Sequence, residues 1–158
     1  MSELQTIGRD ETIAVDALVD EVMVDLEPLA QEKEIKLIGN CKDTTMVGSD
    51  ILIYRMVYNL VENAIKYNHF GGQVTVTAYR KGKNICLSVE DTGSGIPAEL
   101  KERIFEPFFR VDKSRSRQLG GVGLGLALVH EIVRVHDGRI TVQSSPSGGT
   151  IFEVVFTQ

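Results

Sequence analysis

A chain of 158 residues, 42% hydrophobic and 25% charged, has the composition of a soluble globular domain and a length that suits one hydrophobic core. Its formal net charge of −5 argues against general binding to nucleic acid, and no apolar run is long enough to span a membrane. The two cysteines lack CxxC spacing, so neither a zinc knuckle nor a disulfide framework is predicted. We expect one cytosolic domain with no signal peptide or membrane segment.

The first half of the chain predicts two helices and two short strands. Apolar residues at helical spacing predict a helix over residues 14–33, which Pro28 is expected to bend or break near its end. Residues 35–40 alternate as a strand, and residues 45–47 are a second candidate. A helix capped by Ser49 is then expected to run to about residue 67.

A hairpin comes next, with strands predicted over residues 74–79 and 85–89 around a turn at Gly82. Apolar residues at 85, 87 and 89 share one face of the second strand. Because side chains alternate along a strand, continuing this period places Asp91 on the same face. A carboxylate is therefore expected on the core side of the sheet.

The remainder predicts a long irregular segment, a helix and a second hairpin. A short helical piece near residues 98–104 leads into a Gly- and Arg-containing stretch, and we interpret residues 97–122 as a mobile lid because such loops are usually functional. A helix over residues 124–136 precedes strands at 140–144 and 150–156. The predicted fold is an α+β two-layer sandwich, a mixed sheet of about five strands with three main helices on one face.

Asp91 begins the segment Asp-Thr-Gly-Ser-Gly-Ile-Pro. An ionised carboxylate among apolar residues costs several kcal/mol unless it finds donors. The exocyclic amine of adenine is such a donor, and a hydrogen bond to a charged group contributes about 1.5–3 kcal/mol. Gly93 and Gly95 would let the backbone approach the ring. For this segment alone, an aspartate that only starts a Gly-rich turn is an equal alternative.

Two further segments suit a nucleotide's phosphates. Asn59, Asn63, Lys66 and Tyr67 share a polar helix face, where Asn63 would give one oxygen to Mg²⁺ and Lys66 would offset phosphate charge. A solvated helix face is the alternative. The Gly-rich residues 120–126 precede a helix, where backbone amides bind phosphate, but they form neither a Walker A loop nor a Rossmann fingerprint.

Four segments in order, NLVENAIKY, DTGSGIP, IFEPFFR and GGVGLGLALV, resemble the N, G1, F and G2 boxes of the catalytic ATP-binding (GHKL) domain of bacterial two-component sensor histidine kinases. The resemblance implies the Bergerat sandwich and binding of ATP with magnesium. It implies that Asp91 binds the adenine amine, Thr150 helps close the adenine pocket and Asn63 binds the metal. The nucleotide-binding residues that it implies are Asn59, Asn63, Lys66, Tyr67, Asp91, Gly93, Gly95, Ile96, Arg110, Gly121, Gly123, Leu124, Gly125, Leu126 and Thr150.

The resemblance also implies how phosphoryl transfer is supported, by Asn59, Lys66 and Arg110. Lys66 and Tyr67 would contact phosphate, and Arg110 would reach the terminal phosphates from the lid. Hydrolytic relatives typically carry a glutamate where this chain has Asn59, which is no useful base near neutral pH. The site is therefore expected to hold ATP and pass its γ-phosphoryl group to a partner nucleophile.

That nucleophile is expected outside this chain, because His69, His130 and His136 do not lie in a phosphoacceptor sequence. Residues 1–158 are thus expected to be one catalytic domain, monomeric as a fragment, whose dimerisation and phosphoacceptor helices are missing. The partners implied are that helical domain in a homodimeric parent kinase and a response regulator, with Phe105, Phe108 and Phe109 of the lid as a docking surface. Most family members are sensors of the inner or plasma membrane with cytoplasmic catalytic domains.

Two alternatives keep the same fold. An anti-sigma-type serine kinase would phosphorylate a small protein on serine. A degenerate module would bind nucleotide only to control docking of a partner.

Overall fold

The computed structural model describes residues 3–106 and 125–158, and its main feature is a mixed five-stranded sheet. The strand order is β2-β4-β5-β7-β6, in which β2 is parallel to β4 and the other neighbours are antiparallel. The strands are β2 (Lys36–Cys41), β4 (Gln73–Lys81), β5 (Asn84–Asp91), β7 (Thr150–Thr157) and β6 (Arg139–Ser144).

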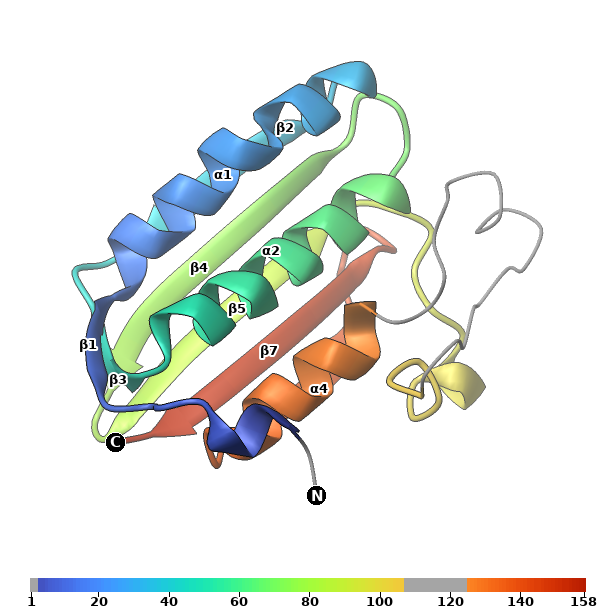
Figure 1. Cartoon of the computed structure of the whole chain (residues 1–158). Helices are drawn as coiled ribbons and strands as arrows, with labels where there is room; N and C mark the ends of the chain where they lie inside the picture. The colour runs from blue at the N-terminus through green and yellow to red at the C-terminus, as the bar shows by residue number, and fades with distance from the viewer. Residues whose placement is uncertain (1–2, 107–124) are drawn as a thin grey trace.

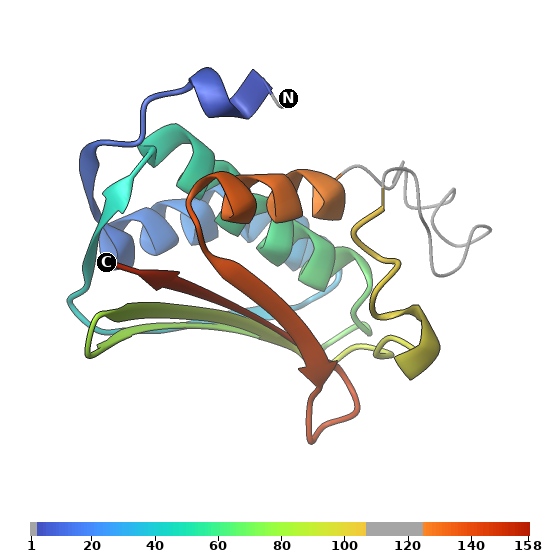
Figure 2. The ribbon, with the colours of Figure 1, turned by 90° about the horizontal axis from the view of Figure 1, so that it is seen from below.

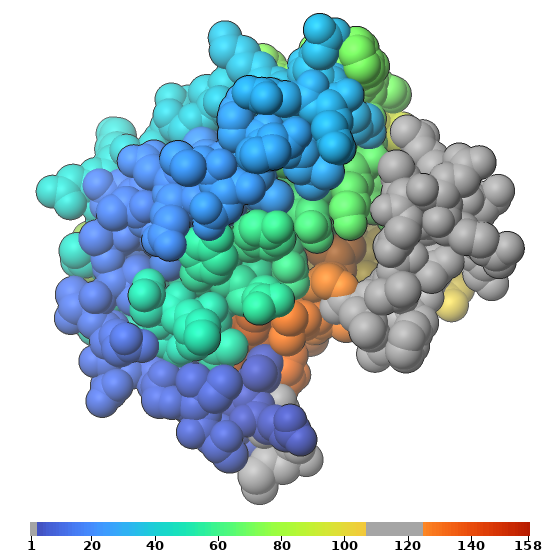
Figure 3. Space-filling model, turned by 45° about the horizontal axis from the view of Figure 1, so that its top comes forward, coloured from blue at the N-terminus to red at the C-terminus, as the bar shows by residue number. Residues whose placement is uncertain are grey.

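In the described residues, three helices cover one face of this sheet (Figure 1): α1 (Val15–Glu32), α2 (Asp50–Lys66) and α4 (Gly125–Val135). Seen from below, all three lie on the same side of the strands (Figure 2). The space-filling view shows the surface that they make together, with α2 between α1 and α4 (Figure 3). This arrangement confirms the predicted α+β two-layer sandwich. No helix in the described part of the chain combines the length and apolar character needed to cross a bilayer.

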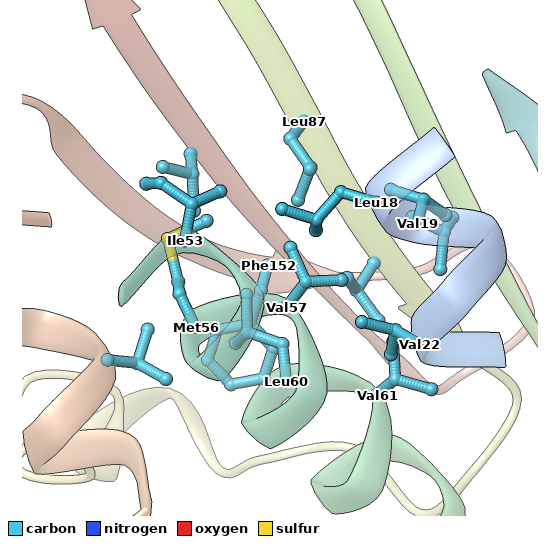
Figure 4. Close-up of a cluster of buried hydrophobic side chains, with 14 of the residues drawn as sticks. Leu18, Val19, Val22, Ile53, Met56, Val57, Leu60, Val61, Leu87 and Phe152 are labelled. Carbon is cyan, nitrogen blue, oxygen red and sulfur yellow. The ribbon is translucent and has the colours of Figure 1, made fainter. Parts of the chain in front are cut away.

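The core lies between the sheet and α2, which contacts both α1 and α4. Apolar side chains recur at every turn of α2, and Val57, Leu60 and Val61 have no exposed surface. They meet Val22 of α1 and Phe152 of β7 in one cluster (Figure 4). Because burying each large apolar side chain contributes about 1.5–3 kcal/mol, this packing fixes the rotation of α2 about its axis. The polar face of α2 is thereby fixed as well.

The N-terminal region differs from the prediction. A 3-10 helix, η1 (Glu3–Thr6), precedes a strand, β1 (Glu11–Ala14), which the sequence did not predict. β1 pairs antiparallel with β3 (Thr45–Gly48) in a separate two-stranded sheet. The strand predicted over residues 45–47 is thus confirmed. β1 was missed because only one of its four residues, Ile13, is buried, so alternation is hardly visible.

Of the bend or break predicted at Pro28, the break is wrong, since α1 continues through this residue to Glu32, while the bend stays a prediction. Proline removes the hydrogen bond to the carbonyl four residues earlier, which belongs to Val24. Pro28 is exposed and Val24 is 72% exposed, so this bond is lost on the solvent side of the helix, where the carbonyl is accessible to water.

The segments around the later strands largely follow the prediction. β4 and β5 form a hairpin through a two-residue loop in which Gly82 has a φ of +63°. The helical piece predicted over residues 98–104 is shorter, a 3-10 helix η2 (Ala98–Leu100) followed by further turns to residue 106. The predicted lid falls largely on residues 107–124, outside the described part, as does the predicted first residue of the third helix.

Candidate functional site

The C-terminal end of α2, the loop after β5 and the start of β7 lie at one end of the sandwich (Figure 1). Asp91 is the last residue of β5 and is 7% exposed, on the face occupied by Leu87 and Val89 as predicted. Its Oδ1 accepts two backbone N–H groups, from Gly93 at 2.8 Å and from Thr150 at 3.3 Å. No described residue donates a hydrogen bond to its Oδ2, so that oxygen is available to a ligand donor.

The pKa of Asp91 is raised above its ordinary value because burial disfavours the charged form. The hydrogen bonds from Gly93 and Thr150 act in the opposite direction, since they stabilise the carboxylate. A ligand donor facing Oδ2 would add to these two N–H groups. The site therefore favours a donor such as an amine over a second acceptor.

Glycines allow the backbone segments around Asp91 to approach one another. A Cβ at Gly93 would lie 2.5 Å from the carbonyl oxygen of Tyr67, and one at Gly149 only 2.0 Å from the carbonyl oxygen of Asp91. Gly95 has a φ of +76° and lies against Gly148. These glycines thus join the loop after β5 to α2 and to the turn before β7. Their predicted contact with a purine ring remains a prediction.

The predicted polar residues of α2 occupy its last turns. Asn59 and Asn63 are half-buried and one turn apart. Lys66 is the last helical residue and pairs with Glu62 at 3.8 Å, and Tyr67 is the C-cap residue. The close approach of Tyr67 to Gly93 brings this end of the helix to the Asp91 loop. Within the described part of the chain, Asp91 and the polar residues of α2 therefore lie at one end of the domain (Figure 1).

Asn68 is a site residue that the sequence analysis missed. It is 1% exposed, and its Nδ2 donates to the carbonyl of Gln73 at 3.0 Å. Its Oδ1 accepts from the hydroxyl of Thr92 at 3.0 Å and from the N–H of His69 at 2.8 Å. These bonds tie the end of α2 to the end of β5. An asparagine after a helix is common, so nothing in the sequence marked it.

The predicted residues Arg110, Gly121, Gly123 and Leu124 lie outside the described part, as do Phe108 and Phe109. Of the Gly-rich segment the structure describes only Gly125 and Leu126, which begin α4, and Ile96 is half-buried in the loop after β5.

Phe105 packs on the core, with its ring centroid 6.2 Å from that of Phe152 and 5.4 Å from that of His130. In the described part it covers other side chains and is only partly exposed. Its predicted role in docking remains a prediction.

His136 joins the end of α4 to the start of α2. Its Nδ1 lies 2.8 Å from the carbonyl of Ile132 and therefore carries the proton, so Nε2 accepts the N–H of Ser49 at 3.0 Å. Burial lowers the pKa of His136, and the positive charge of Arg9 lowers it further, against the opposing effects of the Ile132 carbonyl and Asp137. His136 is thus a structural residue that must stay neutral to accept this bond.

We expect His136 to make the folded state less stable in mild acid. Because its folded-state pKa lies below its ordinary value of 6.5, the unfolded chain takes up the proton first. Stability that is fully present above pH 6.5 is therefore lost as the pH falls from there through the folded-state pKa. Urea denaturation of the wild type and of His136→Gln at about pH 7.5 and about pH 5.5 measures this. The wild type should lose more free energy of unfolding than the variant; equal losses would assign the pH dependence to other groups.

The residues present fit a magnesium ion only if a ligand supplies most of its oxygens. The described residues contain no cluster of three or more His, Cys, Asp or Glu side chains that could hold a metal ion. Asn63 offers a single neutral oxygen from a half-exposed helix position. This is the donor set expected where magnesium enters together with phosphate and water.

Similar proteins of known sequence and structure include sensor histidine kinases. SenX3, a sensor-like histidine kinase of Mycobacterium bovis, is 40% identical over 141 residues, which are 89% of this chain and 34% of that protein. The chain thus spans about a third of the length of the curated relatives it matches first. The structure of the catalytic domain of histidine kinase ThkA has a TM-score of 0.84 and 27% identity, covering 95% of this chain and 96% of that one.

ThkA in complex with the response regulator protein TrrA also matches, with a TM-score of 0.79 and 26% identity over 94% of this chain and 41% of that one. Residues 48–158 match the family described as "Histidine kinase-, DNA gyrase B-, and HSP90-like ATPase". The resemblance seen in the four sequence boxes is therefore confirmed. This chain belongs to the family of histidine kinase-, DNA gyrase B- and HSP90-like ATPases.

Proposed function

We propose that residues 1–158 form the catalytic domain of a sensor histidine kinase, which binds ATP with magnesium and donates the γ-phosphoryl group to a histidine on a separate helical domain. The observation that carries this proposal is the hydrogen bonding of Asp91. One of its oxygens accepts both backbone N–H groups, and the other would accept the adenine amine. Membership of an ATPase family supports ATP as the nucleotide.

At the phosphate end, Asn63 would hold the metal, and Lys66 and Tyr67 would contact phosphate oxygens. Magnesium, when bound, supplies positive charge that offsets the phosphates during transfer. Arg110, on a lid over residues 97–122, would reach the terminal phosphates. Asn59 has no useful basicity near neutral pH, so water at the site would not be activated rapidly and ATP would persist until an acceptor arrives.

The relatives support histidine as the acceptor over the serine of an anti-sigma-type kinase, since those named above are histidine kinases. The helical domain that carries this histidine would also dimerise the parent protein. A response regulator is the proposed later partner, as ThkA is bound to TrrA. We further propose that the domain is cytoplasmic and that its parent is a membrane sensor.

Phosphoryl transfer tests the proposal directly. The protein extended upstream to include a helical domain is incubated with magnesium and ATP labelled at the γ-phosphate. We expect an acid-labile, base-stable phosphohistidine, no label on the chain alone, and label at least about tenfold lower in Asn63→Ala, a loss typical of a weakened metal site. An acid-stable label on another protein would favour a serine kinase, and ATP binding without label would favour a docking module.

A further inference from the structure

The ammonium group of Lys33 donates hydrogen bonds to three carbonyl oxygens at the end of α2. Its Nζ lies 2.9 Å from the carbonyl oxygen of Lys66, 2.8 Å from that of Asn68 and 3.3 Å from that of Ile65. Lys33 itself is the C-cap residue of α1, more than thirty positions earlier in the chain and outside every box that the sequence analysis singled out.

Elementary properties of a helix end explain why a lysine suits this place. The last carbonyls of a helix have no partner within it and carry the negative end of the helix dipole. An ammonium group brings three N–H donors and a positive charge, so one side chain can donate to three carbonyls at once. Of the three, the Ile65 carbonyl also accepts the N–H of Asn68 at 3.2 Å. Lys33 is half-buried, which removes part of the competing water.

The backbone around Lys33 is tied to the same region. The carbonyl of Lys33 accepts the N–H of Gly71 at 2.8 Å, and the N–H of Lys36 donates to the carbonyl of Gly72 at 3.0 Å. Between them Glu34 adopts a left-handed conformation, with a φ of +52°. Two backbone hydrogen bonds thus connect the turn after α1 to the turn after α2.

On its other side, the same short segment of α2 meets the Asp91 loop. The carbonyl of Tyr67 lies against Gly93, and Asn68 is bonded to Thr92. Residues 65–68 are therefore held between Lys33 and the loop that carries the adenine contact. They include two of the proposed phosphate-binding residues and lie within one turn of the proposed metal ligand.

We propose that Lys33 is a positioning residue for the phosphate half of the nucleotide site. It touches neither base nor phosphate in this role; it fixes the path of residues 65–68, so that Lys66 and Tyr67 meet the phosphates and Asn63 meets the metal. The adenine half depends on Asp91, whose hydrogen bonds do not involve Lys33. This inference rests on the function proposed above.

The test compares a ligand with phosphates and one without. Affinities for ATP with magnesium, by calorimetry, and for adenosine, by NMR titration, are measured for the wild type, Lys33→Met and Lys33→Arg. We expect Lys33→Met to weaken binding of ATP at least about tenfold and that of adenosine by less than about threefold, and we expect Lys33→Arg to recover most of the loss, because its guanidinium also donates to several carbonyls.

Lys83→Met is the matched control, since it removes the same charge from an exposed position in the β4–β5 loop, at the opposite end of the strands. Its affinity for ATP should equal that of the wild type. Should Lys33→Met not fold, Lys33→Gln takes its place with the same expected selectivity. An unchanged affinity for ATP, or equal losses for both ligands, would overturn the role of Lys33. A wild type that does not bind ATP would instead refute the proposed function.

Discussion

Replacing Asp91 with asparagine is expected to weaken ATP binding by about ten- to a hundredfold, the loss that matches a hydrogen bond to a charged group worth about 1.5–3 kcal/mol. Asparagine has one acceptor oxygen where aspartate has two. If that oxygen keeps the N–H groups of Gly93 and Thr150, the amide nitrogen faces the adenine amine, donor against donor. If the amide is flipped so that its oxygen faces the adenine amine, its NH₂ group instead faces the N–H groups of Gly93 and Thr150, again donor against donor. Calorimetry with ATP measures the loss.

Glu90→Gln is the control for this substitution. It makes the same change of acid to amide one residue earlier, on the opposite face of β5, where Glu90 accepts the hydroxyl of Ser145. Its affinity for ATP should remain near that of the wild type. Near-normal binding by Asp91→Asn would remove the adenine assignment and with it the central support for a kinase.

A methyl group added at residue 149 should have a comparable effect without replacing any polar side chain. In Gly149→Ala the new Cβ would lie 2.0 Å from the carbonyl oxygen of Asp91 and 2.8 Å from its Oδ1. Backbone must move to relieve this, and it cannot do so while the N–H of Thr150 keeps its bond to Asp91. We expect a loss of about 1–3 kcal/mol in the free energy of unfolding, as is usual for overpacking, together with a loss of ATP affinity.

Urea denaturation and calorimetry report the two effects separately. Gly8→Ala serves as the control, because its Cβ would meet only Asp10, at an ordinary contact distance of 3.7 Å. It should change stability by less than about 0.5 kcal/mol, the range of surface substitutions. A Gly149→Ala variant that binds ATP normally would mean that the turn before β7 moves independently of Asp91.

Local periodicity accounts for what the sequence predicted well. The alternation of Ile85, Leu87 and Val89 predicted the face of β5 on which the Asp91 side chain lies, and the structure confirms that this carboxylate is buried on that face. The apolar face of α2 likewise predicted that Asn59 and Asn63 lie together on its polar face. Side-chain direction follows from backbone geometry alone, so no knowledge of distant neighbours was needed.

What the sequence did not predict depends on neighbours distant in the chain. The pairing of β1 with β3 joins Glu11 to Gly48, and β1 has too few buried residues to show an alternating pattern. The contact of Lys33 with the end of α2 spans more than thirty residues. Thr150 was expected to help close the adenine pocket, but no local pattern predicted that Gly149 lies against the carbonyl of Asp91. In the sequence, nothing therefore distinguished Lys33 from the other charged residues.

Side chains from elsewhere in the chain hold both ends of α2. At its start the N-cap residue Ser49 donates its N–H to His136. At its end Lys33 donates to the carbonyls of its last two residues and to that of Asn68. Helices ordinarily fray first at their termini, where amide protons exchange with solvent through small local openings. Here neither terminus can open without releasing His136, which follows α4, or Lys33, which follows α1. Slow exchange in the last turn of α2 should therefore track cooperative opening of the whole domain.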